Sequence, residues 1–243
     1  ADRLKNRQRV GSGLYNGMIW PLRNYKVKAA IWYQGESNSG RPHEYNALMT
    51  SLIENWRELW PDMPFLLVQL PNFMQKHPQP TDSGWARIRE AQLQAFKNIP
   101  NTALAVNYDI GEWNDIHPLN KKAVAQRLFL GARKIVYNEK VTYSGPVYKD
   151  MKIDGNKIVL TFTETGKGLA IKDGKALKHF AIAGADKKFV WADAVIKGNT
   201  VVVSSKDVPN PVAVRYAWAD NPDEANLINK EGLLASPFRT DNW

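Results

Sequence analysis

Two short polar segments carry the side chains best suited to catalysis. The first, Gln34–Asn38 (Gln-Gly-Glu-Ser-Asn), directly follows the apolar, β-forming run Ala29–Tyr33. The second, Asp109–Pro118, contains His117 and follows another expected strand. Because ligands gather at the carboxyl ends of parallel strands, polar groups just past those ends are placed for chemistry. We expect the two segments to share one edge of a sheet and to form the site there.

His117 is the best candidate for a general base. A catalytic imidazole needs an acceptor on its second nitrogen. Four acidic residues are available for that role: Asp109, Glu112, Asp115 and the distant Glu36. A lone histidine in a polar loop more often caps a helix, but a second polar cluster at the same edge favours catalysis.

Other catalytic arrangements have weaker support. Ser37 offers a hydroxyl, as a nucleophile or as a cap of the following helix. His43, His77 and His179 have the settings of surface residues, and no His-x-His or His-x-x-x-His spacing indicates a metal site. The chain has no cysteine, no glycine-rich phosphate loop after a strand, and no Gly-x-Ser-x-Gly motif. We therefore expect neither a metal nor a cofactor.

The spacing of apolar residues predicts an α/β first part. Helical periodicity covers residues 14–25 (interrupted by Pro21), 41–60, 85–99 and 123–137, and strand-like runs cover 27–33, 65–70 and 102–106. Strands that alternate with helices predict a parallel, doubly wound sheet.

The spacing of the apolar residues changes near Val141. Short β-rich segments follow at 157–162, 189–191, 200–203 and 212–218, and Asp154-Gly155 and Asp173-Gly174 mark turns. We expect an α/β domain over residues 1–140 and a small antiparallel β domain over 141–243.

Composition limits the partners. A hydrophobic content of 44% is enough for a sizeable core. The net charge is +9, but residues 1–28 hold seven Lys or Arg and one Asp, so most of the excess lies in a short basic arm. A nucleic-acid surface needs basic residues along a whole face. No apolar run reaches 18 residues. We expect neither nucleic acid nor a membrane as a partner.

Four motifs in register resemble the sialate O-acetylesterase group of the SGNH-type esterases. They are Trp32–Asn38, Leu14–Leu22, Asp115–Pro118 with Asn120-Lys121, and Ser236–Thr240. The resemblance implies a three-layer, flavodoxin-like parallel sheet and an esterase that removes O-acetyl groups from sugars by a Ser–His mechanism without a metal. It also implies a periplasmic or secreted protein.

The resemblance assigns roles to individual residues. His117 matches the catalytic histidine, which activates the serine and then protonates the leaving sugar alcohol. Gln34 matches an oxyanion donor, and Asn16 is a candidate second donor. Glu36 and Asp115 are equal candidates for the acid partner of His117, and a backbone carbonyl is a third.

Two further positions match the family near its substrate. They are Arg89, whose guanidinium suits a sugar carboxylate, and Gln69. An ion pair on the helix surface is the alternative for Arg89.

The family's nucleophile block, of the Gly-Gln-Ser-Asn-Met type, does not occur in this sequence. We expect the nucleophilic serine on an upstream segment or a separate chain, and the α/β domain to be incomplete, with an unpaired edge on strand 27–33. The partners are then the N-terminal part of the same esterase and an acetylated sugar. The alternative function is a catalytically silent carbohydrate-binding module, which the nine tryptophans favour.

Overall fold

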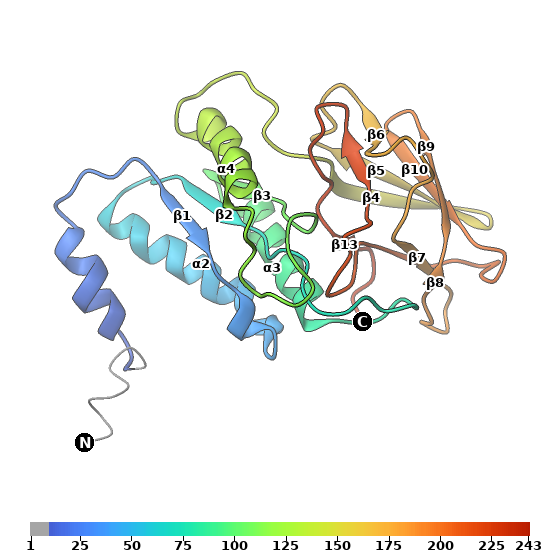
Figure 1. The fold of residues 1–243 in the computed structure, drawn as a ribbon, viewed down its shortest axis with the longest axis horizontal. Helices are drawn as coiled ribbons and strands as arrows, with labels where there is room; N and C mark the ends of the chain where they lie inside the picture. The colour runs from blue at the N-terminus through green and yellow to red at the C-terminus, as the bar shows by residue number, and fades with distance from the viewer. Residues whose placement is uncertain (1–9) are drawn as a thin grey trace.

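The computed structural model describes residues 10–243 (Figure 1). Residues 1–9, the first part of the expected basic arm, lie outside the described residues. The fold combines a parallel sheet, covered by helices, with separate antiparallel sheets in the second half of the chain.

A parallel sheet of three strands organises the first half. The strands are β1 (Ala30–Tyr33), β2 (Phe65–Val68) and β3 (Thr102–Ala105), in the order β1-β2-β3. Every residue of β2 and β3 is buried, as continuous apolar runs predict for strands covered on both faces. Their carboxyl ends therefore lie at one edge, which confirms the expected placement of the polar segments.

Helices cover both faces of this sheet. They are α2 (Pro42–Leu59), α3 (Gly84–Asn98) and α4 (Lys121–Ile135). Phe65 of β2 contacts Trp56 of α2, with ring centroids 5.8 Å apart. The neighbouring Leu66 faces the other way and lies below Gly131 of α4. Because successive strand residues alternate between faces, α2 and α4 lie on opposite sides, giving three layers.

The chain before β1 forms short helical turns rather than one α-helix. A π-helical turn, η2 (Tyr15–Ile19), continues into a 3-10 turn, η3 (Trp20–Leu22). Pro21 lies in the first turn of η3. Its fixed φ and missing N–H are tolerated there, because the N–H groups of a first helical turn have no partner within the helix. A further 3-10 turn, η4 (Glu36–Asn38), follows β1.

Antiparallel sheets follow α4. Two have four strands each, ordered β4-β5-β10-β9 and β13-β11-β7-β8, and a third pairs β12 with β6. The expected hairpin at Asp154-Gly155 joins β4 to β5, and Gly155 has a φ of 58°. The strand bounds are β4 Val147–Asp154, β5 Lys157–Thr163, β6 Leu169–Ile171, β7 Phe180–Ala183, β8 Val190–Trp191, β9 Asp193–Lys197, β10 Thr200–Ser204, β11 Ala213–Tyr216, β12 Leu227–Asn229 and β13 Phe238–Arg239.

The two halves share one hydrophobic core. The buried apolar cluster runs from Ile53 of α2 to Phe238 of β13. At the junction, the Tyr108 and Tyr216 hydroxyls lie 3.1 Å apart, and Arg239 donates to Glu90 of α3 at 2.8 Å. The β-rich half is therefore packed against α3 and the loop after β3.

Residues 10–243 contain neither a helix suited to span a membrane nor a cluster suited to bind a metal ion. No helix there combines the length and apolar character needed to cross a bilayer. No group of three or more His, Asp or Glu side chains there has an arrangement that suits a metal ion.

Candidate functional site

The turn after β1 is fixed by close packing. Gly35 has a φ of 149°, and a Cβ at this position would lie 2.9 Å from a methyl carbon of Ile88. Only glycine combines this backbone conformation with so little space. The polar segment Gln34–Asn38 is thereby turned sharply out of the sheet.

Gln34 is held by three side chains. Its Nε2 donates to Asn38 Oδ1 at 2.8 Å. Its backbone carbonyl accepts from the Tyr45 hydroxyl at 2.7 Å and from Gln92 Nε2 at 3.0 Å. One N–H of the side-chain amide remains for another acceptor, since the amide has two.

Glu36 lies in η4, half-buried and close to two tyrosines. Burial, with the charge of Glu36 as a smaller contribution, raises the pKa of Tyr33 to about 12. In the described part of the chain, no cation lies within 4.0 Å of the Glu36 carboxylate, His117 included. The structure therefore does not bring Glu36 and His117 into contact.

His117 is open to solvent. Its side chain is 86% exposed, and its Nδ1 lies 3.9 Å from Asp115 Oδ1. The same carboxylate oxygen accepts the backbone N–H of His117 at 2.8 Å. Asp115 is thus the acid beside the imidazole, although 3.9 Å is longer than a hydrogen bond. Among residues 10–243, no side chain donates to or accepts from the imidazole nitrogens.

The loop that carries His117 is tied to the loop after β2. Gly111 N–H donates to Asn72 Oδ1 at 2.7 Å, and a Cβ on Gly111 would overlap the Asn72 carbonyl oxygen. Asn72 in turn donates to Asn221 of the β-rich half at 3.1 Å, and Trp113 O accepts from Met74 N at 2.8 Å. The position of His117 therefore depends on both halves of the protein.

Tyr33 and Lys121 connect the two polar segments. The Lys121 ammonium lies 5.3 Å from the centre of the Tyr33 ring. Tyr33 immediately precedes Gln34, and Lys121 begins α4 shortly after His117. This contact places the two segments at the same edge, as their positions after β1 and β3 predict.

Asp109 belongs to an ion-pair network. Its side chain is 7% exposed and accepts from Arg127 at 2.7 Å and from Lys172 at 2.9 Å. Burial alone would raise its pKa, but the hydrogen bonds and charges of Arg127 and Lys172 hold the pKa of Asp109 below its ordinary value. Asp109 thus stabilises the start of the loop rather than orienting His117.

Arg89, expected near a substrate, lies wholly inside the protein. It is 0% exposed, and its guanidinium donates to the carbonyl oxygens of Leu70, Pro71, Ala219 and Asp220 at 2.6–2.9 Å. Burial lowers the pKa of Arg89 to about 9, so it remains cationic at neutral pH. A substrate carboxylate would have to displace these carbonyls, so neither the expected substrate contact nor a surface ion pair describes its environment.

Gln69 is also 0% exposed. Its Nε2 donates to Arg89 O at 3.0 Å and to Ser236 Oγ at 2.9 Å. Gln69 Oε1 is buried without a hydrogen-bond partner among the described residues. These contacts connect Gln69 and Arg89 to the Ser236–Thr240 motif inside the protein.

Asn16 lies in η2 and is exposed. Its backbone N–H donates to Ser12 O at 2.8 Å. No hydrogen bond joins its side chain to Gln34 or His117 within residues 10–243, so its expected role as an oxyanion donor stays a prediction.

Three residues that hold the site in place were not expected: Asn72, Gln92 and Asn221. Gln92 had a signal in the sequence, because it lies four residues after Ile88 on the apolar face of α3, where a polar residue implies a buried partner. Asn72 and Asn221 had no such signal in the sequence, since they are 149 residues apart and meet only in the folded chain.

An α/β sheet whose polar loops meet at the carboxyl edge, with a histidine–carboxylate pair on one of them, is typical of hydrolases. The model of the family "Carbohydrate esterase, sialic acid-specific acetylesterase" matches residues 3–130, and the chain belongs to this family. This confirms the family resemblance that the motifs predicted.

Comparison with individual relatives gives the same family. The chain is 34% identical to human sialate O-acetylesterase and 32% identical to the mouse enzyme, over 93% of its own length but only 48% and 46% of theirs. The crystal structure of a carbohydrate acetylesterase from Xanthomonas citri is 46% identical, with a TM-score of 0.90 over 95% of this chain and 54% of that one. The chain thus spans about half the length of the relatives that it matches.

Proposed function

We propose that this chain supplies the general base of an esterase that removes O-acetyl groups from sugars. The observation that carries the proposal is the placement of His117: an exposed imidazole beside Asp115, at the carboxyl edge of the parallel sheet. Membership of the carbohydrate esterase family supports the reaction class.

The proposed reaction has two steps. His117 takes the proton of a serine hydroxyl as its oxygen attacks the acetyl carbonyl, and then gives that proton to the sugar oxygen as the ester bond breaks. Water, activated by the same imidazole, next releases acetate from the serine. Gln34 donates its remaining N–H to the oxyanion, and Asn16 is the proposed second donor.

We place the nucleophilic serine on a segment outside residues 10–243. No serine hydroxyl within the described chain is hydrogen-bonded to His117, and Ser37, the serine nearest in sequence to Gln34, is exposed in η4. His117→Ala in the full-length esterase is expected to lower the hydrolysis of p-nitrophenyl acetate at least about a thousandfold.

Ser37→Ala serves as the matched control and is expected to retain activity. Circular dichroism should be unchanged in both variants, since both side chains are exposed. Unchanged activity in His117→Ala would refute the proposal, and loss of activity in Ser37→Ala would make Ser37 the nucleophile.

Asp115 is the proposed acid partner of His117, because it is the carboxylate closest to the imidazole. Asp115→Asn should lower kcat about a hundredfold by removing the charge that orients and stabilises the imidazolium. Glu36→Gln, at the other candidate acid, should change kcat less than about fivefold. The reverse order would assign the role to Glu36.

The exposed apolar surface around β1 supports the proposed partner, an upstream segment of the same esterase. Ile31 is 63% exposed although its neighbours in the sheet, Leu66 and Ala103, are buried, and Leu14 and Met18 are 52% and 63% exposed. β1 pairs only with β2 in the described chain. We propose that the upstream segment pairs with β1 and covers this surface.

The intact mass of purified, active enzyme tests this partner. A longer chain or a second polypeptide is expected, and full activity from these 243 residues alone would contradict it. A periplasmic or secreted location is proposed from the family resemblance, and fractionation of the producing cells tests it.

A further inference from the structure

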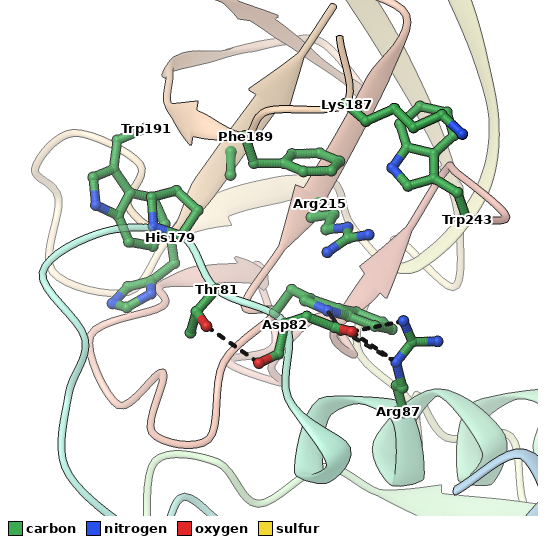
Figure 2. Close-up of a pocket in the computed structure, with 12 residues that line it drawn as sticks. Thr81, Asp82, Arg87, His179, Lys187, Phe189, Trp191, Arg215 and Trp243 are labelled. Atoms are coloured by element: carbon green, nitrogen blue, oxygen red, sulfur yellow. Dashed lines mark hydrogen bonds and ion pairs between the residues drawn. The ribbon is translucent and has the colours of Figure 1, made fainter. Parts of the chain in front are cut away.

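A separate cavity lies where the loop before α3 meets the β-rich half. A cavity of about 320 Å³ opens there, and Figure 2 shows side chains from both halves around it. This volume is at the lower end for small-molecule sites. None of its lining residues belongs to Gln34–Asn38 or Asp109–Pro118, so the cavity is separate from the proposed active site.

Aromatic rings form much of the cavity wall. Trp191 is 37% exposed, and its indole Nε1 donates to Pro78 O at 2.8 Å, which ties β8 to the loop before α3. His179 packs edge-on to Trp191, with ring centroids 5.4 Å apart. Phe189 and Trp218 complete this wall. Such rings offer flat apolar faces with polar edges, which suit the mixed surface of a sugar ring.

Cations outnumber acids in the cavity lining. Arg87, Lys187 and Arg215 line it, against the single carboxylate of Asp82. Asp82 pairs with Arg87 at 2.7 Å, and Arg215 pairs with Asp241, which is 0% exposed, at 2.8 Å. In the described chain, no carboxylate lies within 4.0 Å of the Lys187 ammonium, which lies 5.1 Å from the Trp243 ring centre. One positive charge is therefore left for a ligand.

Two buried polar atoms at the cavity lack partners. His179 Nδ1 and Trp243 Nε1 have no hydrogen-bond partner among the described residues. Both residues line the cavity. Buried polar groups are normally hydrogen-bonded. Because both atoms are fully buried, a ligand in the cavity reaches them only if the His179 or Trp243 ring turns toward it.

Hollows in the surface lead from this cavity toward His117. His179 and Trp191 also line a second hollow of about 580 Å³. That hollow shares Lys76 and Asn221 with a third, of about 550 Å³, which is lined by Gly111–Asn114 of the loop that carries His117. The three hollows therefore adjoin one another through shared lining residues, and the third reaches the loop that carries His117.

We propose that the cavity binds an acidic sugar unit of a glycan whose acetylated unit lies at His117. The aromatic wall would hold the ring, and Lys187 would pair with the carboxylate. The choice of a sugar over another planar anion rests on the proposed function. The proposal makes the preferred substrate an oligosaccharide rather than a single acetylated sugar.

Calorimetric titration tests this directly. 3′-Sialyllactose, which carries no O-acetyl ester and is therefore not turned over, is titrated into the full-length protein, with lactose as the neutral control. Lys187→Gln and Trp191→Ala should each weaken sialyllactose binding roughly tenfold. Trp191→Phe should keep most of the affinity, because it retains a ring but loses the bond to Pro78. Lys149→Gln, at an exposed lysine of β4 outside the cavity, should leave it unchanged.

The outcomes separate the two proposals. Absence of sialyllactose binding, equal binding of lactose, or equal affinity in Lys187→Gln, Trp191→Ala and Lys149→Gln would overturn the cavity proposal. Sialyllactose binding that Lys187→Gln weakens supports the cavity proposal even if the wild-type protein hydrolyses no acetyl ester. That last result would refute only the proposed function.

Discussion

Arg89 donates hydrogen bonds to four backbone carbonyl groups, two from the loop after β2 and two from the β-rich half. A buried cation is stable only when its donors are satisfied, and here the backbone satisfies them. Arg89 thereby fixes the loop that begins at Gln69 against residues Ala219 and Asp220. Its role in this structure is to hold the two halves in register beneath the site.

Replacing Arg89 should therefore cost stability. Arg89→Met leaves four carbonyl groups with unsatisfied hydrogen-bonding capacity, and we expect the Tm to fall by about 6 °C or more. Arg87→Met, two residues earlier on the same helix, breaks only a partly exposed pair with Asp82 and should lower the Tm by less than about 3 °C. Scanning calorimetry measures both variants. Equal losses would contradict the assigned role of Arg89.

At the scale of elements, the loops that follow the strands carry the proposed catalytic residues, and tight contacts between the loops fix the positions of these residues. The loop between β3 and α4 approaches the loop after β2 so closely that Gly111 has no room for a side chain. Alternation of strands and helices predicts that these loops share an edge. The close approach itself depends on Asn72 and Asn221, which meet only after folding.

Gly111→Ala tests whether this contact positions His117. The added Cβ would overlap the Asn72 carbonyl oxygen, so the loop must shift, and we expect esterase activity to fall at least about tenfold. Gly40→Ala, with nothing within 4 Å of its added Cβ, is the matched control and should keep full activity. The p-nitrophenyl acetate assay measures both, and full activity in Gly111→Ala would show that the loop contact is dispensable.

At the scale of the whole molecule, the β-rich half contributes residues to the contacts that hold the candidate site and to the cavity. It supplies Asn221 to the loop network, Lys172 to Asp109 and most of the aromatic cavity. The shared hydrophobic core makes the two halves one packed unit. Contacts from both halves therefore determine where His117 and the proposed sugar-binding cavity lie.

The ion pairs of Asp109 join α4 to the β-rich half and should make stability depend on pH. Since the folded-state pKa of Asp109 is lowered, its contribution is present above the unfolded value and is lost as the pH falls through the folded value. Asp109→Asn should lower the Tm by about 4 °C or more at pH 7. Below about pH 4 the difference from wild type should shrink, and calorimetry at several pH values measures it. A difference that grows in acid would contradict this.

Local pattern was sufficient for much of the fold. The periodicity in 41–60, 85–99 and 123–137 marks α2, α3 and α4 to within a few residues, and the apolar runs at 65–70 and 102–106 contain β2 and β3. Several short strands, such as β6, β7 and β12, gave no clear alternation. Strands of three or four residues depend on their partners across the sheet, which lie far away in the sequence.

The sequence by itself determined the family and the parallel order that brings the polar segments to one edge, and it predicts His117 as the general base, because motif identity and hydrophobic period are local properties. Tertiary structure decided that Arg89 and Gln69 lie in the core, that Asp115 rather than Glu36 is beside His117, and that Trp191 and Lys187 share a cavity. These are matters of burial and of contact between residues distant in the chain, and residue type alone does not specify them.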